Sequence, residues 1–117
     1  MDGALIVDKP SGWTSHDVVN KVRRLANTKK VGHLGTLDPL ATGVLPLVIG
    51  RATRMAQFFT RNDKVYEARI RFGWSTDSYD ADGAPTSSPV EVRLDAEELR
   101  RLLKSYEGES LQTPPPV

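Results

Sequence analysis

Asp38 is the side chain of this sequence best suited to covalent chemistry. It lies in the run His33-Leu34-Gly35-Thr36-Leu37-Asp38-Pro39-Leu40-Ala41-Thr42-Gly43 and is the only acidic residue between Val18 and Asn62. Eight basic residues share that window: Lys21, Arg23, Arg24, Lys29, Lys30, Arg51, Arg54 and Arg61. A cationic field favours the ionised form of a carboxyl group and attracts phosphates. The pattern therefore indicates a carboxylate nucleophile that works on a nucleic acid.

Other readings of these residue types are simpler. A single Asp-Pro beside glycines is usually turn chemistry, and a tyrosine on the inner face of a strand, such as Tyr66, is usually a core residue. His16 and His33 lack metal-ligand spacing. The cluster Asp77, Asp80 and Asp82 lacks the later glutamate of a calcium loop, so we interpret it as a turn and expect no metal.

Composition alone describes one ordinary soluble globular domain, with 117 residues, 38% hydrophobic, 26% charged and a formal net charge of +1. Polyanion binding is indicated only by the charge distribution, because residues 18–62 hold one acid and eight bases whereas residues 63–117 hold eleven and seven. The absence of cysteine excludes disulfides and thiolate metal sites. No apolar run approaches the roughly 18 residues of a membrane span, and the start lacks a signal peptide, so we expect no membrane and a cytoplasmic location.

The first half of the chain has the pattern of alternating strands and helices. Ala4 to Val7 predicts a buried strand, and Ser15 is expected to cap a helix with apolar residues at helical spacing through Ala26. The apolar run 44–49 predicts a strand that Pro46 makes start late or lie at an edge. A short helix is expected over residues 53–60.

The second half predicts one strand, one turn and one helix. Residues 64–72 alternate apolar and polar as a half-buried strand does, with Tyr66 near its start. Residues 80–85 are turn chemistry. Asp95 with Glu98 predicts a capping box for a helix that runs through Tyr106 and ends at Gly108. Residues 112–117 follow as an extended segment, and the whole is predicted to be α+β.

The motifs resemble those of the bacterial TruB-type tRNA pseudouridine synthases. The likeness begins at residues 3–12 (GALIVDKPSG), peaks at residues 32–43 (GHLGTLDPLATG), and continues through residues 64–66 (KVY) and 76–83 (TDSYDADG). The long second block is specific, whereas the Lys-Pro pair or the KVY tripeptide alone is weak. The last segment is similar to that of the bacterial, stand-alone enzymes rather than the guide-RNA-dependent ones.

The resemblance implies a mixed, largely antiparallel sheet with flanking helices and isomerisation of the T-loop uridine at position 55 of tRNA, without a cofactor. It implies that Asp38 is catalytic, Tyr66 stacks on the base, His33 contacts RNA and Asp80 joins an ionic network. Base flipping would expose the target atom, and stacking on an aromatic ring is worth roughly 1 to 3 kcal/mol per base. The residues themselves leave open whether Asp38 attacks C6, attacks the anomeric carbon or acts as a base at the sugar. Further candidate substrate contacts are Gly35 and Thr36, with Lys9, Lys64 and Arg54 as phosphate or structural partners.

Residues 1–117 resemble only the N-terminal part of such a catalytic domain. The family's RNA-gripping loop, arginine-bearing strand and C-terminal RNA-binding extension have no counterpart in the sequence, so the chain by itself is expected to have little or no activity. Three alternatives stay open: the front half of a tRNA-modifying isomerase, a non-catalytic RNA-binding or tRNA-chaperone module, or a fragment completed by a separate chain. Without such a partner we expect a monomer.

Overall fold

The computed structural model describes residues 1–116 and divides into two compact units, residues 1–66 and residues from 67 onward. The elements are β1 (Gly3–Lys9), α1 (Ser15–Leu25), β2 (Val31–His33), β3 (Gly43–Ile49), the 3₁₀ helix η1 (Gly50–Met55), α2 (Ala56–Phe59) and α3 (Ala96–Lys104). All but α3 belong to the first unit. No helix within residues 1–116 has the length and apolar character needed to cross a bilayer.

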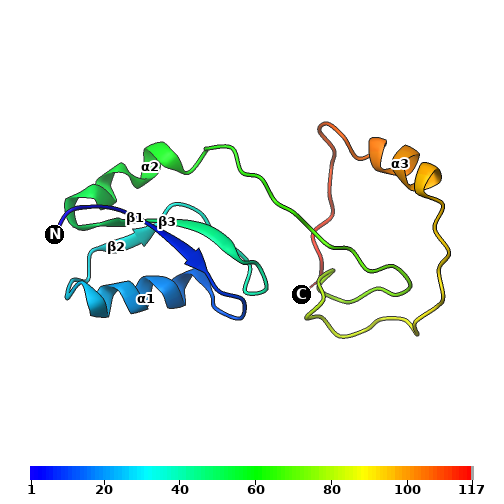
Figure 1. Cartoon of the computed structure of the whole chain (residues 1–117), viewed down its shortest axis with the longest axis horizontal. Helices are drawn as coiled ribbons and strands as arrows, with labels where there is room; N and C mark the ends of the chain where they lie inside the picture. Colours follow the sequence, from blue (N-terminus) through cyan, green and yellow to red (C-terminus); the bar gives the residue numbers. More distant parts are fainter. Residues whose placement is uncertain (117) are drawn as a thin grey trace. The chain divides into compact units, whose positions relative to one another are not determined.

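The first unit is built on a three-stranded antiparallel sheet in the order β1-β3-β2. Val7 pairs with Leu45 and Val31 with Ile49, so the alternation of side chains along each strand turns these residues to one face. The amphipathic helix α1 packs against that face and adds Val18, Val19 and Val22 to the core, while η1 and α2 lie toward the other face (Figure 1). These elements confirm the predicted α+β class.

Helix α1 is capped by Thr14, one residue before the predicted cap. The Thr14 hydroxyl accepts from the Asp17 N–H at 3.0 Å, and the Asp17 carboxylate accepts from the Thr14 N–H at 2.9 Å, which is a complete capping box. The Thr14 backbone and hydroxyl hold the pKa of Asp17 below its usual value because they bond to the ionised form. Ser15 is freed from capping and, as shown below, makes a different contact.

Pro46 lies in the central strand, so the prediction that it marks a late start or an edge was wrong. Its carbonyl accepts from the Leu34 N–H at 2.9 Å, on the β2 side of β3. A strand residue presents its N and O to the same neighbour, and β2 ends at His33, one residue before that bond. Pro46 therefore faces Leu34, just past the last paired residue of β2, and its missing N–H omits one bond at the end of the ladder and not within it.

The predicted strand over residues 64–72 does not form in the structure. Its side chains alternate in polarity, but no segment within residues 1–116 pairs with it, and Tyr66 is 61% exposed. Alternation sets which face is apolar, whereas a strand also needs a hydrogen-bonded neighbour. The short helix predicted over residues 53–60 corresponds to η1 and α2.

The second unit consists of a turn region and α3. The predicted turn is confirmed: Thr76 bridges Pro85, the Gly83 N–H donates to the Asp80 carbonyl at 3.1 Å, and Asp77 accepts from the Ala84 N–H at 2.9 Å. Asp95 caps α3 by accepting from the Glu97 N–H at 3.1 Å. The predicted capping box with Glu98 was wrong, because the Asp95 carboxylate bonds one residue earlier and Glu98 makes no return bond to the Asp95 N–H.

The predicted C-terminal end of that helix was wrong by two residues. Helix α3 ends at Lys104, two residues before Tyr106, since the chain turns at Ser105 before reaching Gly108. Residues 112–116 are extended without pairing, and Val117 lies outside the described residues.

Candidate active site

The loop that carries Asp38 is held by a buried lysine. Lys9 is 0% exposed, and its ammonium donates to the carbonyls of Pro10 at 2.9 Å, Trp13 at 2.6 Å and Pro39 at 3.1 Å. These three bonds use all three N–H donors of a lysine. Of the two predicted roles for Lys9, phosphate partner or structural partner, its contacts fit the structural one. A buried ammonium whose three donors are all used cannot bind a phosphate.

Both chain neighbours of Asp38 are anchored. Pro39 accepts a second bond, from the Gly12 N–H at 2.8 Å. Leu37 donates its N–H to the Ser15 hydroxyl at 2.9 Å, accepts from the same hydroxyl at 3.3 Å, and packs its side chain against the core. Ser15 is 3% exposed and lies in the first turn of α1. The start of α1 and the end of β1 thus fix the loop on each side of the carboxylate.

Asp38 itself is exposed. Its carbonyl accepts from the Ala41 N–H at 2.9 Å, which closes the turn after it. No basic side chain within residues 1–116 lies within 4.0 Å of its carboxylate. The side chain is therefore open to a substrate, while the backbone on each side is fixed.

The cationic field predicted around Asp38 was wrong for most of the residues counted. The Asp38 loop lies at the end of the unit where β1 ends and α1 and β3 begin, whereas six of the eight bases lie in the last turn of α1 or after the opposite ends of α1 and β3. With 11 residues, α1 separates the two ends by about 16 Å, at 1.5 Å per residue. These basic residues are close to Asp38 in sequence but far from it in the structure, because α1 and β3 run the length of the unit. The six are Arg23, Arg24, Lys29, Lys30, Arg51 and Arg54.

One lysine from outside that window does reach the loop. A side-chain carbon placed on Gly35 would lie 2.8 Å from the Lys64 ammonium, so Lys64 covers this glycine. Gly35 was predicted as a substrate contact, but in the structure the space beside it is occupied by this cation of the same unit. Among the predicted phosphate partners, Lys64 is thus exposed and also contacts the Asp38 block, whereas Lys9 contacts the block but is buried.

His33 ends β2 and turns back on the same loop. Its Nδ1 lies 2.6 Å from the Gly35 carbonyl, which can only accept, so Nδ1 carries the hydrogen of that bond. In the neutral ring, Nε2 is then left as an acceptor.

The remaining predicted residues are spread over the two units. Thr36 is exposed in the Asp38 loop, Tyr66 is exposed at the end of the first unit, and Arg54 is exposed in η1. Asp80 belongs to the second unit, where its carboxylate accepts from the Ala81 N–H at 2.7 Å. Its predicted role in an ionic network stays a prediction.

The sequence analysis missed Ser15 as a support of the loop and took it for a helix cap. No sequence signal distinguishes the two roles, because both are made by a hydroxyl at a helix start. Within residues 1–116, His, Asp and Glu side chains form no group of three that could hold a metal ion.

Comparison with known proteins identifies the family of this site. A family model described as "TruB family pseudouridylate synthase (N terminal domain)" matches residues 23–117. The chain belongs to this family. It is 69% identical over its full length to the tRNA pseudouridine synthase B of Solibacter usitatus and 47% identical over 116 residues to that of Aquifex aeolicus, and it spans 40% of the length of each. The family resemblance inferred from the Asp38 block is confirmed.

Solved structures agree with the family assignment. A chain of a Cbf5-Nop10-Gar1 complex matches 97% of this chain with a TM-score of 0.64 and 30% identity, and 29% of that chain is covered. A chain from an H/ACA RNP bound to a substrate RNA containing 2'-deoxyuridine matches 94% with a TM-score of 0.64 and 28% identity, again with 29% covered. The pseudouridine synthase fold predicted from sequence is thus shared with these proteins.

Proposed function

We propose that this chain supplies the nucleophile of an enzyme that converts a uridine of tRNA, the T-loop uridine 55, into pseudouridine. The observation that carries the proposal is the Asp38 loop, in which an exposed carboxylate stands between two anchored neighbours in a member of the TruB family. A fixed backbone lowers the entropy lost when the nucleophile meets its target.

The reaction breaks the bond between uracil N1 and the ribose C1′ and forms a bond from C5 to C1′. The hydrogen on C5 is lost and N1 gains one, so atoms and electrons balance without an oxidant or a cofactor. Asp38 would stabilise the detached ribose or base by covalent attack, or take a proton at the sugar. A cytoplasmic location would suit such a substrate.

Reaching the base requires that it leave the RNA stack. Tyr66 is exposed and belongs to the same unit as Asp38, so its ring is available to stack on a flipped uracil. His33 and Lys64 both contact Gly35 in the Asp38 loop, which supports their proposed role as contacts to the RNA backbone near that nucleotide.

The test uses a chimera, because the chain spans 40% of its relatives. Residues 1–117 replace the matched segment of the Solibacter usitatus protein, and the product is incubated with tRNA transcript tritiated at uridine C5. Release of tritium reports loss of the C5 hydrogen. Asp38→Asn should lower the rate by at least about 10³-fold, as expected when a nucleophile is removed, whereas the matched control Asp82→Asn in the exposed turn should not.

Two results would decide against the proposal. If the Asp38→Asn chimera still releases tritium at the rate of the unmutated chimera, Asp38 takes no part in the reaction. RNA binding without any tritium release, in a chimera whose parent protein is active in parallel, favours the alternative of a non-catalytic RNA-binding module.

A further inference from the structure

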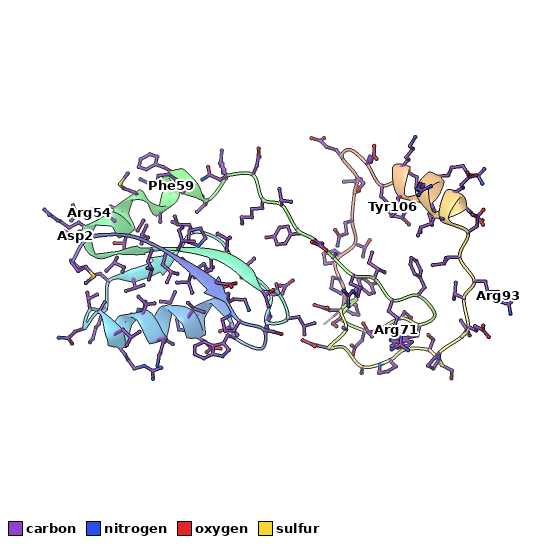
Figure 2. All side chains as sticks on the ribbon, in the orientation of Figure 1. Asp2, Arg54, Phe59, Arg71, Arg93 and Tyr106 are labelled. Atoms are coloured by element: carbon purple, nitrogen blue, oxygen red, sulfur yellow. The ribbon has the colours of Figure 1, made fainter. Side chains whose placement is uncertain are left out.

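The end of the first unit opposite Asp38 carries a concentrated positive charge. Here the chain leaves α1, enters β2, and passes from β3 into η1, and the Gly50 N–H donates to the Lys30 carbonyl at 2.8 Å to join these segments. Figure 2 shows Arg54 and Asp2 labelled at this same end. We call the exposed residues Arg24, Lys29, Lys30 and Arg54 the basic pole.

The charge of the basic pole is not neutralised within the unit. Asp2 is the only acidic residue in segments 1–3, 23–32 and 49–56, and it is bound by Arg51 at 2.7 Å. Within residues 1–116, none of the four pole residues forms an ion pair. The C-terminal end of α1 contributes roughly half a negative charge, which is small against four cations.

Part of the pole borders a shallow, open depression. It is lined by Arg23, Arg24, Asn27, Thr28 and Lys29 at the end of α1. Asn27 has a φ of 47°, and this left-handed residue turns the chain so that Lys29 returns beside Arg24. Arg23 supports the wall by donating to the Val31 carbonyl at 3.2 Å and to the Asn20 side chain at 3.2 Å.

We propose that the basic pole is a second RNA-contact surface, which binds backbone phosphates of the same RNA whose uridine reaches Asp38. The inference rests on the proposed function. The pole lies about 16 Å from the Asp38 loop along α1, so a ligand that engages both ends must be an extended polyanion. A folded RNA meets this requirement, and lysine and arginine contacts to phosphates position it without reading its sequence.

Salt-dependent binding of unmodified tRNA by the 117-residue chain tests the inference. In the pole variant, Arg24, Lys29 and Lys30 are each replaced by Gln. The matched control replaces Arg100, Arg101 and Lys104 of α3, which are also exposed, and removes the same charge. Each lost phosphate contact reduces the slope of log affinity against log salt by about 0.7 to 0.9.

The pole variant should therefore lose about 2 to 3 units of slope and bind at least about tenfold more weakly at 0.1 M salt, whereas the α3 control should keep most of both. The inference is overturned if the pole variant keeps the wild-type slope, if the α3 control loses as much, or if the wild-type slope is below about 2. Asp38→Asn separates the two proposals. Made in the chimera of the activity test, it should stop tritium release while the salt slope of tRNA binding stays that of the unmutated chimera. A failure of the chemistry then does not alter the result for the pole, and a failure of the pole does not alter the result for the chemistry.

Discussion

Replacement of Lys9 by Met measures how strongly the buried lysine holds the Asp38 loop. Methionine keeps most of the side-chain volume and removes the ammonium. The carbonyls of Pro10 and Trp13 then lose their recorded donor, whereas Pro39 keeps the bond from Gly12. Carbonyls left without a partner in a buried site cost about 1 to 3 kcal/mol each.

Part of that cost is offset because a buried ammonium no longer has to be desolvated. We therefore expect the free energy of unfolding of the first unit to fall by about 2 to 4 kcal/mol, measured by urea denaturation. Hydrogen exchange adds a local readout: the Gly12 N–H, bonded to the Pro39 carbonyl, should exchange faster because the loop it holds is loosened.

Lys30→Met is the matched control, because Lys30 is exposed and its change should stay within about 0.5 kcal/mol. If Lys9→Met behaves like this control in both the unfolding free energy and the Gly12 exchange rate, the ammonium does not hold the loop and our account of the site is wrong.

Three further perturbations probe the supports of the site. Ser15→Ala removes the only recorded partner of the Leu37 N–H and should cost about 1 to 2 kcal/mol in urea unfolding, and a cost below about 0.3 kcal/mol would contradict the anchor. Gly50→Ala should cost about 1 to 3 kcal/mol, because φ is 66° and the new carbon would overlap the Asp2 carboxylate; an unchanged melting temperature would refute this. Asp17 has a lowered pKa when folded, so its contribution is present above pH 3.8 and is lost as the pH falls through the lowered pKa; unfolding midpoints from pH 6 to 2 should therefore fall more steeply in the wild type than in Asp17→Asn, and parallel curves would exclude the linkage.

Local patterns predicted the elements that depend on neighbours in sequence. The period of Val18, Val19 and Val22 predicted α1, and the turn over residues 80–85 formed as expected, whereas Asp95 caps α3 without the predicted capping box. Capping, helical periodicity and tight turns are decided within a few residues, so they are readable without tertiary knowledge. Residues 64–72 show the limit of such patterns, because pairing depends on another segment.

The sequence by itself determined the family and the candidate nucleophile, because the Asp38 block is a long local motif. Only the tertiary structure decided what surrounds that residue. Lys9 and Ser15 act on the loop through backbone carbonyls and an amide 22 to 30 positions away, and such contacts leave no residue pattern. The structure also moved most of the basic residues to the other end of the unit, since α1 and β3 carry the chain away from Asp38 before it reaches those charges. Proximity in sequence became separation in space because the regular elements are rigid and span the unit.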